Sequence, residues 1–237
     1  MAEPSFEFRA PTFTRAMKTL AAVLAVIWLV SVLLQGAGFA GFTGPFGVLE
    51  PLALVPAAVV QRGFAWQLVT YGLLHDPGGV VSLVFTVLAL WFMGSPLEER
   101  WGARRVFALL GAATLAGGVC VVAAGFVSPR IFRGVVVSPA AAVSALLAAW
   151  GAVHARQRVS FLGLATLSGA QLLGLMAAVA ALQFVWQRDG AGVASLAGFP
   201  VGYLFGARSA PRGGTRSRRE SGPNLRVIRG GGSDLPN

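Results

Sequence analysis

The sequence predicts an all-α, polytopic membrane protein built as a bundle of six transmembrane helices. The 237-residue chain is 55% hydrophobic and only 12% charged, and its mean hydropathy is +0.70. Soluble domains carry about 25% charged residues, so a soluble core of this size has no room for so much apolar surface. Long apolar runs also recur along the chain, with arginine-rich connections between them. The lipid bilayer is therefore the first expected partner.

Six stretches have the apolar composition, and most have roughly the 20-residue length, that a bilayer-spanning helix needs. They are residues 18–38, 77–95, 106–127, 138–155, 160–186 and 191–207. The third and fifth are long and free of charge, whereas the sixth is short and rich in glycine. No convincing small-residue cleavage pattern follows the basic N-terminal arm, so we expect a retained first helix.

The basic residues predict the orientation of these helices. The net charge of +10 comes mostly from arginine. Lys and Arg gather in the N-terminal arm, after the second and fourth stretches, and in the C-terminal tail. Cytoplasmic segments of membrane proteins collect these residues, so both termini are expected in the cytoplasm. This placement fits a membrane better than it fits nucleic acid, and no nucleic-acid partner is expected.

The chain divides into a cytoplasmic arm (1–17), a membrane domain (18–207) and a basic tail (208–237). The tail is poor in apolar residues and rich in Gly, Ser, Pro and Arg. It is therefore expected to be disordered and able to contact anionic lipid. Residues 39–76 are apolar but broken by Gly and Pro, which favours an interfacial loop with Trp66 and Tyr71 near the headgroups.

Two motifs in the sequence resemble rhomboid intramembrane serine proteases. Residues 66–75 (WQLVTYGLLH) resemble the start of the second helix in that family. Residues 89–102 (ALWFMGSPLEERWG) are similar to its cytoplasmic junction between helices two and three. With the same helix order, the resemblance implies a rhomboid-like six-helix bundle. The residues expected to form the structural junction are Glu98, Glu99, Arg100 and Gly102.

The resemblance also places the catalytic positions. Rhomboids use a serine at the start of helix four and a histidine on helix six, because a serine nucleophile needs a base to take its proton. Aligned without gaps, the nucleophile position falls on Ala140, whose methyl group cannot attack a carbonyl. The base position falls on Ser195, within Ala194-Ser195-Leu196, and a hydroxyl is a poor proton acceptor at neutral pH.

The positions that help to hold the oxyanion in the family are vacated as well. Its histidine and asparagine, four residues apart, become Ser82 and Thr86. The upstream His75 matches a family histidine with a supporting structural role. The resemblance thus implies a catalytically inactive pseudo-rhomboid without catalytic residues, a cofactor or a metal site. The lone Cys120 offers no disulfide and is expected to be a small core residue.

Inactive rhomboid relatives bind client membrane proteins without cutting them, and the same function is implied here. The resemblance implies a laterally open cavity between helices two and five that receives transmembrane segments of client proteins. The polar side chains expected to line this cavity are His75, Ser82, Thr86 and Ser195.

Two other functions stay open. An active protease would use Ser138 as a shifted nucleophile with His75 as its base, although Ser138 before Pro139 is typical of a helix start with serine as the N-cap. A small transporter or channel is disfavoured because buried ionisable residues, the usual mark of ion pathways, are scarce. His154, at the end of the fourth stretch, is interpreted as an interfacial residue.

Small residues recur every fourth position in the fourth and sixth stretches, which lets helix backbones approach closely. They are Ala141, Ala145 and Ala149 in the fourth, and Gly198, Gly202 and Gly206 in the sixth. In rhomboids these two helices meet to bring the serine and histidine together. The dominance of arginine over lysine hints at a GC-rich bacterial genome, and hence at a bacterial inner (plasma) membrane protein.

Overall fold

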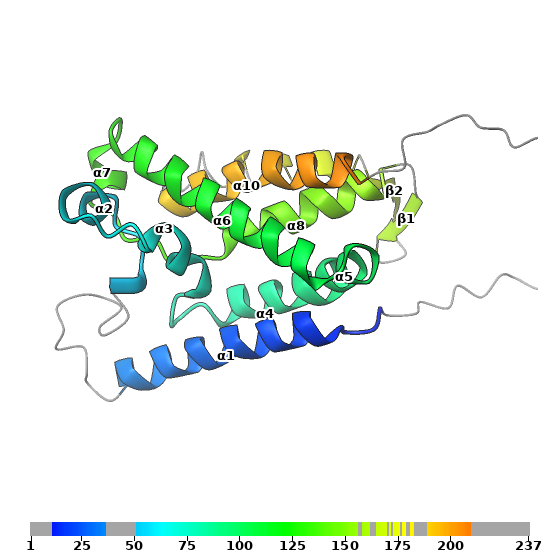
Figure 1. The fold of residues 1–237 in the computed structure, drawn as a ribbon, viewed down its shortest axis with the longest axis horizontal. Coiled ribbons are helices and arrows are strands. Elements are labelled where there is room, and N and C mark those ends of the chain that lie inside the picture. Colours follow the sequence, from blue (N-terminus) through cyan, green and yellow to red (C-terminus); the bar gives the residue numbers. More distant parts are fainter. Residues whose placement is uncertain are drawn as a thin grey trace, which may run out of the picture.

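The computed structural model describes residues 11–36, 51–155, 158–161, 165–169 and 189–209, with residues 171, 173–175, 177–178 and 181–182. These residues are mainly helical (Figure 1). The helices are α1 (Arg15–Gly36), α2 (Pro56–Arg62), α3 (Gln67–Thr70), η3 (Tyr71–Leu73), α4 (Val80–Ala89), η4 (Leu90–Gly94), α5 (Ser95–Trp101), α6 (Ala103–Gly125), α7 (Pro129–Phe132), α8 (Ala140–Val153) and α10 (Gly190–Ala207). Two strands are described, β1 (Arg158–Phe161) and β2 (Ala165–Ser168).

Four helical stretches among the described residues are long and apolar enough to cross a membrane. They are Arg15–Gln35, Val80–Trp101, Ala103–Gly125 and Gly190–Ala207. These stretches match the first, second, third and sixth predicted spans. The fourth predicted span corresponds to α8, a shorter helix of 14 residues. The helical, polytopic membrane fold class is confirmed, while the count of six spans stays a prediction.

The fifth predicted span is wrong at its start. Its first residues belong to β1 and β2 instead of a helix. These two strands form an antiparallel pair in which Val159 lies opposite Leu167. The run RVSF alternates polar and apolar residues and includes β-branched valine, which favours a strand. The described residues from 169 to 182 are helical, and the rest of the predicted span lies outside the described residues.

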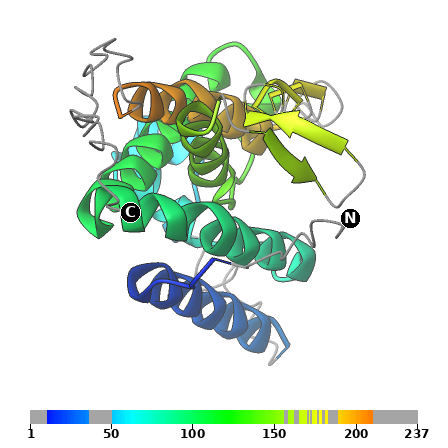
Figure 2. The ribbon, with the colours of Figure 1, turned by 90° about the vertical axis from the view of Figure 1, so that its right-hand side faces the viewer.

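The helices are arranged in layers. Figures 1 and 2 show α1 as the outermost helix, lying beside α4, with α6, α8 and α10 grouped on the other side of α4. α4 continues through the π-helical turn η4 into α5 as one helix. The chain then turns at Gly102, whose φ of 80° and ψ of 154° suit only glycine. Gly102 therefore separates α5 from α6 and redirects the chain into the bundle.

The acidic pair of α5 binds the segment at the start of α1. The Glu98 carboxylate accepts hydrogen bonds from the Thr14 hydroxyl and from the Met17 N–H, the latter at 3.3 Å. Glu99 accepts one from the Thr12 hydroxyl at 2.5 Å. The first N–H groups of a helix have no partner within it, so Glu98 satisfies one of them from 81 positions away. The sequence predicts Glu98 and Glu99 only as charges at the junction between two helices and does not indicate this contact with α1.

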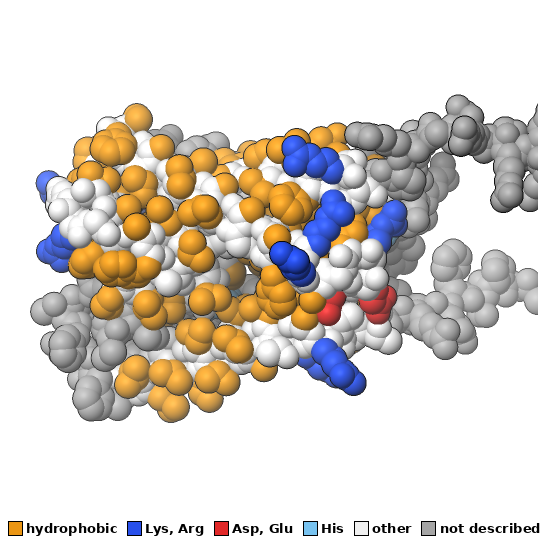
Figure 3. Space-filling model, viewed as in Figure 1, with side chains coloured by type: hydrophobic (Ala, Val, Ile, Leu, Met, Phe, Trp, Pro, Cys, Tyr) orange, Lys and Arg blue, Asp and Glu red, His pale blue; other side chains and the backbone are white. Residues whose placement is uncertain are grey.

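The surface matches a membrane setting. Figure 3 shows apolar side chains over the middle of one face, with the acidic residues and several basic residues at the α5 end. Cys120 is exposed on α6, so its prediction as a core residue is wrong. A thiol is apolar enough to face lipid, and the hydropathy of a run cannot tell its lipid face from its core face.

Candidate functional site

The contact between α8 and α10 depends on three glycines. A Cβ atom on Gly198 would overlap the carbonyl oxygen of Ala141. A Cβ atom on Gly202 would likewise overlap the carbonyl oxygen of Ala145. A Cβ on Gly206 would lie 2.7 Å from the carbonyl oxygen of Ala149. The structure thus places each predicted glycine against its predicted alanine, so the two helix backbones touch along three turns.

The position of the expected catalytic base lies inside this contact. Ser195 is 9% exposed, and its Oγ lies 2.8 Å from the Oγ of Ser144, which is 5% exposed. The two hydroxyls share one hydrogen bond, and neither group accepts a proton readily at neutral pH. Nothing in the local sequence pairs these two serines, which lie 51 positions apart. Ser195 precedes Gly198 whereas Ser144 follows Ala141, so their spacing from the glycine contact gives no signal on two helices that run in the same direction.

The start of α8 carries no nucleophile at the aligned position. Ala140 is the first residue of this helix, with Pro139 as the residue before it. The Ser138 Oγ accepts a hydrogen bond from the Ala140 N–H at 3.1 Å. The Ser138 N–H donates to the Tyr71 carbonyl at 3.3 Å. The Ser138 hydroxyl therefore satisfies the first N–H of α8 from one residue before the N-cap, Pro139, and α8 begins one residue later than the sequence indicated.

His75 is buried beside α4. Its side chain is 2% exposed, and its Nε2 lies 3.2 Å from the Thr86 Oγ1. The Thr86 hydroxyl donates to the Ser82 carbonyl at 2.9 Å, so Nε2–H is the donor toward Thr86 and Nδ1 is left as an acceptor. This Nδ1 has no hydrogen-bond partner among the described residues. Burial lowers the pKa of His75 to about 4, which makes the imidazole a weak base.

Because the His75 imidazole is buried, we expect the free energy of unfolding to fall in acid. The pKa of His75 is about 4 when folded against 6.5 unfolded, so the unfolded state binds more protons between these values. Unfolding free energy should therefore fall by up to about 3 kcal/mol as pH drops from 6.5 to 4. Unfolding curves of His75→Gln in detergent should show a flatter pH dependence than wild type. His154→Gln is the matched control, and equal flattening by both variants would contradict the assignment.

The second histidine lies at the opposite end of α8 from Ser138. The Nδ1 atom of His154 is 2.9 Å from the Trp150 carbonyl oxygen, and its ring stacks on Trp150 at 4.5 Å. The chain has only two histidines, and neither is hydrogen-bonded to a serine within the described structure. Among the described residues, no group of three His, Cys, Asp or Glu side chains is placed to hold a metal ion.

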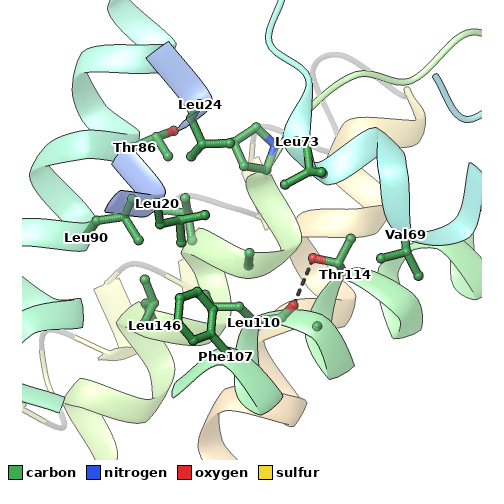
Figure 4. A pocket seen from close by; sticks show the side chains of 15 residues that line it. Leu20, Leu24, Val69, Leu73, Thr86, Leu90, Phe107, Leu110, Thr114 and Leu146 are labelled. Atoms are coloured by element: carbon green, nitrogen blue, oxygen red, sulfur yellow. Dashed lines mark hydrogen bonds between the residues drawn. The ribbon is translucent and has the colours of Figure 1, made fainter. Parts of the chain in front are cut away.

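A cavity of about 210 Å³ opens between α1, η3, α4, α6 and α8 (Figure 4). Most of its lining is apolar; the polar side chains are Thr86 and Thr114, whose hydroxyls donate to backbone carbonyls within their own helices. Of the four predicted polar residues, only Thr86 lines it. Ser82 is exposed in the first turn of α4. Ser195 lies in the α8–α10 contact.

Tyr71 lies in the core rather than near the headgroups, so that part of the prediction is wrong. Its side chain is fully buried, and its hydroxyl donates to the Thr114 carbonyl at 2.9 Å. The burial follows from close approach, since a Cβ on Gly118 would lie 2.7 Å from the Leu68 carbonyl oxygen. Trp66, by contrast, is 49% exposed. Hydropathy alone could not separate the two aromatic residues.

The fold and the glycine-mediated contact of α8 with α10 define a polytopic helical membrane protein. The chain belongs to the rhomboid family, since the Rhomboid domain matches residues 62–212. It is similar to Rhomboid-like protein 19 of Arabidopsis thaliana, with 38% identity over 91 residues. This match covers 38% of the chain and 25% of that relative, so the chain spans only about a quarter of the relative's length.

Proposed function

We propose that this rhomboid-family protein is non-proteolytic and binds transmembrane segments of client membrane proteins. The observation that supports the proposal is the Ser144–Ser195 pair: Ser195, which aligns with the family's base position, has the Ser144 hydroxyl 2.8 Å away as its partner. A serine nucleophile requires a base within about 2.6–3.2 Å. Ser195 has a hydroxyl as its partner, and Ala140 has no group to activate.

The helix bundle supports a role in binding client segments that does not require proteolysis. The close α8–α10 contact holds the core together, while His75 presents an unpartnered Nδ1 acceptor beside Thr86. A buried acceptor without a partner costs free energy. His75 does not line the cavity, so a client N–H donor would reach this atom only if the bundle opened locally. Thr86 is one of the two polar side chains in the cavity wall that such a segment would meet.

We further propose that the protein resides in a bacterial inner membrane with both termini in the cytoplasm. The described basic residues around the α5 end, where α1 starts and α10 finishes, are Arg15, Lys18, Arg100, Arg104, Arg105 and Arg208. Arg62, Arg130 and Arg133 lie on connections at the other end. This bias fits the preference of cytoplasmic loops for Lys and Arg. The basic tail would add contact with anionic lipid.

The test is labelling of membrane-reconstituted protein with a fluorophosphonate serine probe, together with client capture. We expect wild type to be labelled no more than heat-denatured protein. We also expect photocrosslinks to a single-span client whose segment carries a central Gly-Pro break, with a lower yield in Thr86→Val. Labelling of wild type would contradict the proposal, and so would equal capture of an unbroken polyleucine segment.

The second candidate is an active protease that uses Ser138 and His75. It is favoured by the hydrogen bond from the Ser138 N–H to the Tyr71 carbonyl, which brings Ser138 to the segment that leads to His75. Against it, the Ser138 hydroxyl caps α8 and the buried imidazole is a weak base. Probe labelling that is lost in Ser138→Ala would establish this candidate.

A further inference from the structure

The cavity between α1 and α6 has the walls of an apolar binding site. Its deepest side chains are Leu90 and Leu146, which are 2% and 0% exposed. Figure 4 shows Leu20, Leu24 and Leu90 on one side of the opening, facing Phe107 and Leu146. No charged residue lines the cavity. Apolar cavities of about 150 Å³ already accept small apolar ligands, so this larger one suits an apolar occupant.

The cavity opens sideways onto the surface that faces lipid. Three of its lining residues are also exposed on the outside: Val69 (46%), Leu73 (40%) and Phe107 (43%). Phe107 lies on α6, and Leu20 and Leu24 on the opposite wall lie on α1, both of which are apolar enough to span the bilayer. The medium outside this mouth is therefore hydrocarbon rather than water.

We infer that this cavity is a binding site for one acyl chain of a membrane phospholipid. The threonine hydroxyls in the wall already donate to Leu110 and Ser82 carbonyls, so they do not select a polar ligand. An acyl chain that enters past Phe107 reaches Leu146. It fills the cavity and makes van der Waals contacts with the apolar wall. Since the chain comes from hydrocarbon, what favours entry is the van der Waals contact that each methylene gains with the cavity wall. The inference goes beyond client binding: the lipid chain fills the cavity when no client is bound, and a client segment that reaches Thr86 would displace it.

Gly111 provides a way to close the site without disturbing the bundle. It lies at the exposed mouth of the cavity, and a Cβ atom there would have nothing within 4 Å. Gly111→Leu therefore fills the entrance without overlapping backbone. Gly174 is the matched control, since it is exposed, helical and equally open, and it is not part of the cavity wall.

The experiment uses full-length protein in phosphatidylethanolamine–phosphatidylglycerol vesicles with a phosphatidylcholine that carries a diazirine near one acyl terminus. After photolysis, mass spectrometry maps the labelled residues. Leu146 is buried, so only an inserted chain reaches it, whereas lipid around the protein labels exposed Phe85 on α4, which is 67% exposed. We expect labelling of Leu146 in wild type and in Gly174→Leu.

In Gly111→Leu, labelling of Leu146 should fall by about tenfold, which corresponds to a loss of about 1.4 kcal/mol of packing contact between the chain and the cavity wall. Labelling of Phe85 should be unchanged, which shows that the variant is surrounded by lipid, and an unchanged circular dichroism spectrum shows that it is folded. The inference is overturned if wild-type Leu146 is unlabelled, which would leave the cavity to a protein segment. It is equally overturned if Gly111→Leu and Gly174→Leu label Leu146 to the same extent.

Discussion

Alanine at position 198 is expected to destabilise the protein by about 3 kcal/mol or more, at the upper end of what overpacking costs. The added methyl group of Gly198→Ala would overlap the carbonyl oxygen of Ala141. Backbone atoms cannot rotate away as a flexible side chain can, so α8 and α10 must separate. Separation would also break the Ser144–Ser195 hydrogen bond. Unfolding followed by circular dichroism against the mole fraction of sodium dodecyl sulfate measures the effect.

The control for this prediction is the same substitution on α6. Gly111→Ala adds a methyl group with nothing within 4 Å, and alanine is the better helix former by about 1 kcal/mol in water. Its stability should equal or slightly exceed that of wild type. If Gly198→Ala matches Gly111→Ala, the two helices do not approach as closely as the geometry requires. If Gly111→Ala is as damaging as Gly198→Ala, glycine itself matters more than the contact.

The spacing of small residues predicted the helix contact because it depends on a simple period. Gly198 and Gly202 recur every fourth residue and so share one face of the helix. Four of the spans were predictable for a similar reason, since a bilayer sets their length and composition. Neither signal says which face of an apolar helix meets protein. Cys120 is exposed and Tyr71 is buried for reasons that lie in the neighbouring helices.

The polar features of the site were harder to predict because each depends on a partner far away in the sequence. Ser144 and Ser195 are 51 positions apart, and Glu98 binds the start of α1. Residues 158–168 show a different limit. Their alternating pattern favours strands, but the apolar residues around them favoured a membrane helix, and hydropathy outweighed local propensity. Resemblance supplied the catalytic positions, while the structure supplied their surroundings.

Restoring both dyad positions is expected to create serine reactivity. In Ala140→Ser/Ser195→His, the first change supplies a hydroxyl at the start of α8 and the second supplies an imidazole on α10. The Ser144 hydroxyl, 2.8 Å from the present Ser195 Oγ, is placed to hydrogen-bond the new ring and fix its orientation. A positioned base accelerates proton transfer by about 10²–10⁴-fold. Fluorophosphonate labelling should therefore rise from background by about 100-fold.

The single substitutions are the controls, because each supplies only one half of the dyad. Ala140→Ser lacks a base and Ser195→His lacks a nucleophile, so both should stay near background. Adding Ser138→Ala to the double variant should leave the labelling intact, since Ser138 only caps the helix. A folded double variant without labelling would mean that α8 and α10 do not hold these two positions in reactive geometry. Labelling confined to Ser138 would instead show that the nucleophile had been assigned two residues too late.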